Sequence, residues 1–378
     1  DPCIEIKCPV MECGKGRELK VRPGECCPHC APESGRCVWW GRHLRTLDGL
    51  LLQHQQHCSY TMISDCTSGL FTVYAKFGDS SWLLGVAVLS IVVGGHHVEL
   101  GRAEGETIQI TVDSISVQLP YMTPGLGVYV RDQHAYINTD MGLQVVWSVW
   151  GQVEVVVSGE HRRRTCGLCG NFNRLPQDDL AMPTGRISHS VEWFLVSWSM
   201  GGACVSPPTD AQCSASESPE AALKYQSAKE LCLVIEGPGF QPCHSTIHPS
   251  AYLAACTTEV CGCPHEPDSC LCSSLQLYAT LCMRAGIHLN WRTNELCPKT
   301  CDEDKILSEC VSPCSVEDSC NSINVTSSTS NSESHIEKIT TSIPSQVLSE
   351  DLTLPSAEDN HYNGSLCPGL CVPGCRCP

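Results

Sequence analysis

Hydrophobic and polar residues alternate along the middle of the chain, between positions 67 and 165, a stretch that contains no cysteine. Apolar side chains recur at every second position in six short runs: 71–77, 108–112, 115–119, 128–130, 147–149 and 153–157. A period of two places one face of each strand on a core. Turn signals separate the runs, at Gly94-Gly95, Glu104-Gly105 and Pro124-Gly125. The pattern predicts an antiparallel β region of roughly 100 residues, large enough to bury a core without internal disulfides.

The longest apolar run extends from Trp82 to Gly95 and is interrupted by Gly85 and Ser90. A helix needs about 20 apolar residues to cross a bilayer. The run therefore predicts a buried strand, and the sequence gives no membrane span.

Residues 213–301 have a helical pattern instead. Ser218 is a good N-cap, and Pro219 suits the first helical position. Further on, Leu277 and Leu281 are spaced for one helical face, and Gly286 is a stop signal. Cysteines are dense here, so we expect single-turn helices tied by disulfides.

Cysteine makes up 30 of the 378 residues. Disulfides form and persist in oxidising compartments, so this content argues against a reduced cytosolic enzyme and for a secreted protein. The chain starts at Asp1-Pro2-Cys3 without a basic or apolar leader, which suggests a processed form or a fragment. Its length allows about two to four domains.

A second cysteine-free stretch, 321–366, lacks any alternation and is rich in Ser and Thr. It carries both N-glycosylation sequons, at Asn324 and Asn363. We expect a disordered, glycosylated insertion. From residue 301 onward, 12 acidic residues face 3 Lys or Arg, a net of −9, so this end supplies more than half of the formal charge of −17. An acidic chain disfavours binding to nucleic acid phosphates.

One motif is highly specific. It is Thr165-Cys166-Gly167-Leu168-Cys169-Gly170-Asn171-Phe172-Asn173, with Asp178-Asp179 shortly after. The motif resembles the hallmark of von Willebrand factor type D domains. Thr46-Leu47-Asp48-Gly49 and Cys58 are similar to the start of such a domain, and Glu192-Trp193-Phe194 with Cys204 to its end. The resemblance covers residues 36–205 and implies a mainly β fold, with a small disulfide-rich helical region and small cysteine-rich modules beside it.

The flanking segments fit the same resemblance. Residues 1–33 are similar to the C-terminal half of a von Willebrand type C module, and residues 213–301 to the eight-cysteine region that follows type D domains. Residues 302–378 resemble a truncated trypsin-inhibitor-like cysteine module that contains the 321–366 insertion. This order most resembles the crossveinless and kielin/chordin-like regulators of bone morphogenetic proteins (BMPs). Mucins, otogelins and von Willebrand factor share the type D part. Trp40-Gly41-Arg42-His43 replaces the family's Gly-Asp-Pro-His, so autocatalytic cleavage at Asp–Pro is not expected.

The resemblance implies a Ca²⁺ site. The matching positions carry the hard oxygen ligands that Ca²⁺ prefers: Asp48, Asn171, Asn173, Asp178 and Asp179. The alternative is a turn that is merely rich in Asn and Asp. Arg174 stands where the family often has glycine.

The resemblance also implies structural disulfides. Cys166 and Cys169 would pair one with Cys37 and one with Cys66, and Cys58 would pair with Cys204. The alternative is a redox-active Cys-x-x-Cys dithiol, which needs an exposed thiolate. Cys27-Pro-His-Cys30 and Cys261-Gly-Cys263 have spacings that zinc could use, but an oxidising compartment favours disulfides there.

The only basic run is His161 followed by Arg162, Arg163 and Arg164. It is a possible heparan sulfate contact, and the alternative is a solvated turn. No catalytic motif is present, so we expect no enzyme. The function predicted from the resemblance is a secreted binding protein that regulates BMP-type growth-factor signalling, with a calcium-stabilised type D domain contacting matrix or proteoglycan. One alternative is a mucin-like or matrix protein assembled through disulfide-linked type D domains, and a weaker one is a protease inhibitor.

Overall fold

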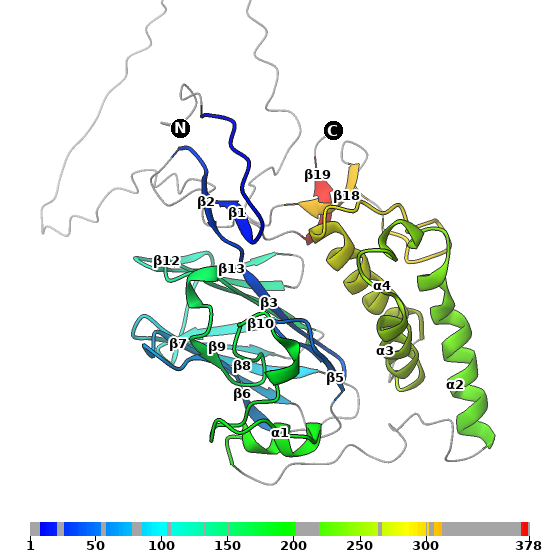
Figure 1. Cartoon of the computed structure of the whole chain (residues 1–378), viewed down its shortest axis with the longest axis horizontal. Helices are drawn as coiled ribbons and strands as arrows, with labels where there is room; N and C mark the ends of the chain where they lie inside the picture. Colours follow the sequence, from blue (N-terminus) through cyan, green and yellow to red (C-terminus); the bar gives the residue numbers. More distant parts are fainter. Residues whose placement is uncertain are drawn as a thin grey trace, which may run out of the picture.

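The computed structural model describes residues 8–20, 26–53, 58–77, 85–103, 107–131, 134–149, 151–201, 219–263, 267–299, 301, 306–311 and 372–376. Cys204, the sequons at Asn324 and Asn363, and the whole 321–366 segment lie outside these residues. Figure 1 shows a β-rich body with a group of helices beside it and a small hairpin at the N-terminal end.

The first sheet is a seven-stranded antiparallel meander, in the order β11-β10-β9-β8-β7-β6-β17. Its last strand, β17, returns from the far end of the domain to pair with β6, with Thr165 opposite Asp65. The strands are β6 (Ser59–Asp65), β7 (Phe71–Phe77), β8 (Val86–Val93), β9 (His96–Arg102), β10 (Ile108–Val112), β11 (Ile115–Ser116) and β17 (Thr165–Cys166).

The second sheet has eight strands in the order β12-β13-β14-β15-β16-β3-β4-β5. The early strand β3 pairs with the late strand β16, with Cys37 opposite Val155. The first strand of the domain is therefore an interior strand of this sheet. The strands are β3 (Gly35–Trp40), β4 (His43–Arg45), β5 (Leu51–Gln53), β12 (Tyr121–Thr123), β13 (Leu126–Arg131), β14 (His134–Thr139), β15 (Leu143–Ser148) and β16 (Val153–Val157).

The core lies between these two sheets, where the alternating side chains meet. Along β7, Phe71, Val73, Ala75 and Phe77 are buried, whereas the residues between them are not. The Trp147 indole of the second sheet donates to the Val86 carbonyl of the first at 3.0 Å. This packing confirms the predicted antiparallel β fold.

Two of the predicted strands are shorter than the alternation suggested. β11 ends at Ser116, and Val117 and Leu119 lie beyond it. Pro120 follows directly and can give no backbone N–H to a ladder. Similarly, β15 ends at Ser148, and Val149 is buried in a turn. A side chain can reach the core from a turn, so alternation alone overestimates strand length.

The helical region that follows consists of α2 (Pro219–Cys232), η5 (Leu233–Glu236), η6 (Gln241–Cys243), α3 (Ser250–Cys261) and α4 (Pro267–Arg284). The prediction of single-turn helices was wrong, because α2, α3 and α4 have 14, 12 and 18 residues. α4 buries Leu275, Tyr278 and Cys282 on one face, which a single turn could not do. The disulfides here include Cys232–Cys256, Cys243–Cys282, Cys263–Cys270 and Cys272–Cys297.

The helices pack on the outer face of β3. Val38 and Trp40 form a buried cluster with Ala255, Leu277 and Leu281 of α3 and α4. A carboxylate completes the contact, because Glu259 of α3 accepts hydrogen bonds from the Arg42 backbone N–H at 2.7 Å and contacts the His43 ring at 2.8 Å. The β-sandwich and the helical region therefore share a packed, partly ionic interface.

Small elements close the ends of the molecule. The N-terminal hairpin joins β1 (Arg17–Lys20) and β2 (His29–Pro32) and carries the disulfides Cys8–Cys27 and Cys13–Cys30. A second hairpin joins β18 (Ile306–Val311) and β19 (Val372–Arg376). The rest are η2 (Gly159–His161), η3 (Pro176–Asp178) and α1 (Val191–Ser197). Across the described ranges, each helix is too short or too polar to cross a bilayer.

Candidate metal centre and its disulfide frame

The hallmark segment lies across the edge of the first sheet. After β17 the chain turns at Gly167, whose φ of +110° suits glycine and where a β-carbon would collide with the Met62 backbone. Backbone bonds then tie the segment down, from Leu168 N–H to Thr61 at 3.2 Å and from Cys169 N–H to Met62 at 2.9 Å. The loop that follows is thereby fixed against the β-sandwich.

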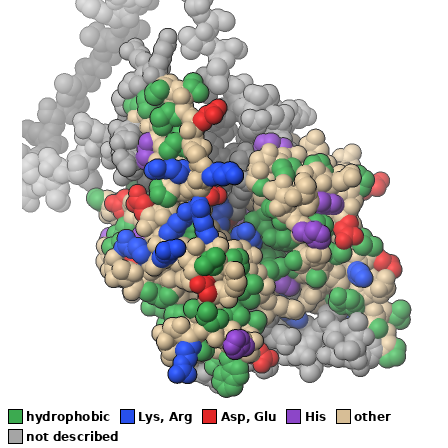
Figure 2. All heavy atoms as spheres, viewed as in Figure 1, with side chains coloured by type: hydrophobic (Ala, Val, Ile, Leu, Met, Phe, Trp, Pro, Cys, Tyr) green, Lys and Arg blue, Asp and Glu red, His purple; other side chains and the backbone are tan. Residues whose placement is uncertain are grey.

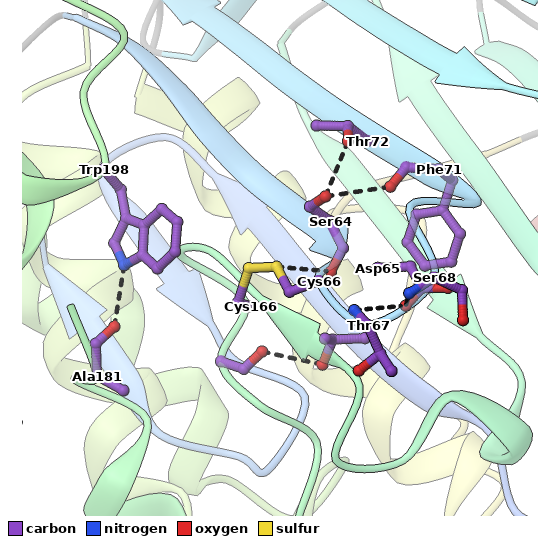
Figure 3. The surroundings of a disulfide bond; sticks show 12 residues. Ser64, Asp65, Cys66, Thr67, Ser68, Phe71, Thr72, Cys166, Ala181 and Trp198 are labelled. Atoms are coloured by element: carbon purple, nitrogen blue, oxygen red, sulfur yellow. Dashed lines mark hydrogen bonds between the residues drawn. A yellow bond between two sulfur atoms is a disulfide. The ribbon is translucent and has the colours of Figure 1, made fainter. Parts of the chain in front are cut away.

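The two cysteines of the Cys-x-x-Cys motif bond to different partners. Cys169 is joined to Cys37 across 132 residues, and both are fully buried. Cys166 is joined to Cys66, which is exposed at the end of β6 (Figure 3). The two cysteines are therefore half-cystines of separate bridges. Cys58 is also in a disulfide, whereas Cys204, its expected partner, lies outside the described residues.

Asp65, next to Cys66, organises the turn that holds the exposed bridge. Its Oδ1 accepts from the backbone N–H groups of Thr67 at 3.1 Å and Ser68 at 3.0 Å (Figure 3). Its Oδ2 lies 3.4 Å from the Arg164 guanidinium. Burial works to raise the pKa of Asp65, but the two backbone hydrogen bonds and the Arg164 and His161 charges outweigh it, so the pKa is lowered.

Three of the five predicted metal ligands, Asp48, Asn173 and Asp178, are linked by hydrogen bonds. Asp48 accepts from the backbone N–H groups of Asn173 at 2.8 Å and Arg174 at 2.7 Å. The Asn173 side-chain amide donates to Asp178 Oδ2 at 2.7 Å. Asp48 thus binds the backbone of the loop, and the Asn173 side chain joins two parts of the loop to each other.

Asp179, the fifth ligand, is fully buried behind the loop. The Thr46 hydroxyl donates to its Oδ2 at 2.6 Å. Gly170, at φ +85°, leaves room for the carboxylate, since a β-carbon there would collide with it. Thr46 and Gly170 are supporting residues that the sequence reasoning did not single out, although both lie in the quoted motifs.

Several oxygens of this cluster lack partners in the described structure. They are Asn171 Oδ1, Asp178 Oδ1 and Asp179 Oδ1, all buried. Burial raises the pKa of Asp179 to about 7, with the Asp48 and Asp178 charges adding to the rise and the Thr46 hydrogen bond opposing it. Buried oxygens without donors are costly, and a hard cation satisfies them. The donor set of carboxylate and amide oxygens therefore fits Ca²⁺.

The carboxylates do not form a ready-made metal cluster by themselves. Among the described residues, no three His, Cys, Asp or Glu side chains are placed to hold a metal. Asp48 already uses both oxygens on backbone N–H groups. A bound Ca²⁺ would therefore depend on side-chain amide oxygens as well, of which Asn171 Oδ1 is buried without a partner.

The predicted basic run does not form one surface. Arg162 approaches Glu33 and stacks over the Phe172 ring at 5.2 Å, whereas Arg164 turns to Asp65. Arg163 is exposed. Figure 2 shows Lys and Arg side chains gathered where the N-terminal hairpin meets the β-sandwich, with acidic side chains among them. Two of the three arginines, Arg162 and Arg164, therefore form local ion pairs.

Neither zinc binding at Cys27 and Cys30 nor a Ser-His-Asp relay at Ser90 fits the side-chain geometry. Cys27 and Cys30 are bonded to Cys8 and Cys13, so they offer no thiolates to zinc. Ser90 and His97 are in contact at 2.7 Å, but the Asp113 carboxylate binds the His96 ring rather than the His97 ring. These residues therefore do not form a catalytic relay.

Comparison with known proteins defines the class. Residues 37–186 match the model of the von Willebrand factor type D domain, and residues 231–298 match the C8 domain. The chain therefore contains a type D domain, formed by the β-sandwich, and a C8 domain, which includes α3 and α4.

The relatives are large proteins. Von Willebrand factor of Bos taurus is 29% identical over 336 residues, which cover 83% of this chain and 35% of that protein. SCO-spondin of Gallus gallus is 32% identical over 298 residues, covering 75% of this chain and 5% of that protein. Mucin-5AC of Homo sapiens is 27% identical over 311 residues, covering 79% of this chain and 5% of that protein. The chain spans about a third or less of the length of these relatives.

Proposed function

We propose that this chain is a non-catalytic, calcium-stabilised binding and structural part of a secreted extracellular protein. The observation that supports it most is the set of buried, unpaired oxygens on Asn171, Asp178 and Asp179. Asp48 and Asn173 would complete the ligand set. The bound ion would neutralise carboxylates that the protein alone leaves uncompensated.

Calorimetric titration of the full chain with Ca²⁺ tests this site. We expect one binding event, and Asp179→Asn should weaken it roughly 10-fold or more because it removes a buried charged ligand. Asp140→Asn is the matched control, since Asp140 is exposed on a turn of the second sheet. Equal affinities in all three proteins would rule the site out.

The relatives favour a function in the extracellular matrix or in a mucin-like assembly. Von Willebrand factor, SCO-spondin and mucins share both the type D and the C8 regions with this chain. Assembly through disulfides would need an unpaired cysteine, and every cysteine whose side chain the structure describes is already bonded. Any intermolecular bridge would therefore come from elsewhere in the protein.

Regulation of BMP-type growth factors is the second candidate. The segment with the N-terminal hairpin, which carries Cys8–Cys27 and Cys13–Cys30, is the one whose sequence resembles half of a type C module. Two measurements separate the candidates: non-reducing electrophoresis of the secreted protein, and surface plasmon resonance against BMP-type ligands. Disulfide-linked multimers support the matrix role, whereas a monomer that binds the growth factor supports the regulator. The predicted glycans at Asn324 and Asn363, the inhibitor-like module and a heparan sulfate contact at Arg163 are further proposals for the same protein.

A further inference from the structure

Arg174 occupies a costly backbone position inside the candidate calcium loop. Its φ is +75°, a left-handed conformation that glycine adopts freely and that a residue with a β-carbon adopts rarely. The side chain is also half exposed, so it is not part of a core. A strained arginine at this point suggests that the side chain itself has a role.

The guanidinium of Arg174 reaches out of the loop to the N-terminal hairpin. It lies 3.5 Å from the Gly16 carbonyl oxygen, at the turn before β1, and 3.5 Å from Glu33 Oε2, just after β2. Gly16 is closely approached, because a β-carbon there would collide with the guanidinium. Gly16 and Glu33 are themselves joined by a backbone hydrogen bond of 3.0 Å, so Arg174 covers the base of the hairpin.

The backbone of the same residue is tied to a candidate metal ligand. The Arg174 N–H donates to Asp48 Oδ1 at 2.7 Å, and the neighbouring Asn173 N–H donates to Asp48 Oδ2 at 2.8 Å. These two bonds hold the Arg174 backbone on the same carboxylate that the candidate calcium site would use.

The hairpin has a second anchor at Arg162, whose guanidinium also lies over the Phe172 ring of this loop. Arg162 donates to the Glu33 carbonyl at 3.0 Å and lies 3.9 Å from its carboxylate. Pro32 and Glu33 also press against Gly159 of η2, where a β-carbon would collide with them. The hairpin therefore keeps the Arg162 and Gly159 contacts without Arg174, whereas its Gly16 turn contacts the loop through the Arg174 side chain.

We propose that Arg174 couples calcium binding in the type D domain to the ordering of the N-terminal hairpin. The inference rests on the proposed calcium site. Calcium fixes the loop, the fixed loop holds Arg174 on Gly16 and Glu33, and the hairpin becomes more ordered relative to the β-sandwich. By linkage, the hairpin contact strengthens calcium binding by the same factor. An exposed ion pair of this kind supports a factor of roughly two to five.

Hydrogen exchange of the full chain, with calcium and with a chelator, tests the coupling. In the wild type, calcium should slow exchange in peptides that cover residues 14–20 and 31–35. In Arg174→Gly, calcium should still protect the loop around Asp178, but the hairpin should exchange at its chelator rate. Calorimetry should show a roughly two- to fivefold weaker affinity.

Arg163→Gly is the matched control. Arg163 is also exposed and has a φ of +61°, so this variant loses the same charge and relieves the same kind of backbone strain. It should behave as the wild type does. A calcium-dependent change in the hairpin that survives Arg174→Gly, or calcium binding without any change in the wild-type hairpin, would overturn the coupling alone. Absence of calcium binding by calorimetry would overturn both the site and the coupling.

Discussion

Glu259 is the buried residue that ties the C8 helices to the type D sandwich, and its removal gives the sharpest test of that interface. The side chain is 6% exposed and serves both the Arg42 backbone N–H and the His43 ring. The Gly41 turn, with φ +48°, closes over the carboxylate. We consider the substitution Glu259→Ala.

The magnitude follows from the groups that are left behind. A hydrogen bond to a charged group contributes about 1.5–3 kcal/mol, and Glu259 receives at least one of that kind. The Arg42 guanidinium is buried, with Nε and Nη2 unpaired, and burial already lowers its pKa while the Glu259 charge opposes that. Breaking a buried pair by removing one partner costs about 3–5 kcal/mol. We expect Glu259→Ala to lower the free energy of unfolding by a similar amount, and Glu259→Gln by less because the amide oxygen still accepts.

Differential scanning calorimetry and chemical unfolding of the full chain measure this loss. The wild type should show a coupled transition of the type D and C8 regions, and Glu259→Ala should separate it into two. Glu236→Ala, an exposed glutamate in the same region, should leave the profile unchanged. A Glu259→Ala protein within about 0.5 kcal/mol of wild type, the usual range for surface substitutions, would refute the interface as described.

Two further predictions concern the disulfide frame and the turn beside it. Mild reduction followed by alkylation should label Cys66 and Cys166 well before the buried pair Cys37 and Cys169, and mass spectrometry would reveal the order; simultaneous labelling would contradict the burial. Because the pKa of Asp65 is lowered on folding, its contribution to stability is complete above its unfolded pKa near 4 and is lost as the pH falls through the folded value. Asp65→Asn should therefore cost more stability at pH 7 than at acid pH, and a cost that is constant with pH would contradict the assignment.

The type D core could be predicted from sequence because its signal is local. Strict alternation in β7 specifies which face is buried, and the pattern is visible without reference to any distant residue. The candidate metal loop could also be proposed from the sequence, because Asn171 to Asp179 form one short segment. The strand ends were less accurate, because Val149 is buried from a turn rather than from a strand.

The remaining features depend on contacts between distant parts of the chain. Glu259 and His43 are 216 residues apart, and nothing near either residue marks it as a partner of the other. In the sequence, Arg174 is only a departure from the family's glycine. The structure shows that its guanidinium contacts the Gly16 carbonyl oxygen. The helix lengths were underestimated because dense cysteines suggested short turns, whereas Cys232–Cys256 joins the long helices α2 and α3 and Cys243–Cys282 joins η6 to α4.

Thermal unfolding of the full chain in calcium and in chelator measures whether calcium stabilises the type D domain. A ligand that binds only the folded state at about 100 times its Kd stabilises that state by about 2.7 kcal/mol. For a domain of this size, that corresponds to a rise in Tm of about 5–10 °C. We expect this rise in the wild type and its loss in Asp179→Asn. An unchanged Tm on removal of calcium would contradict the proposed calcium site.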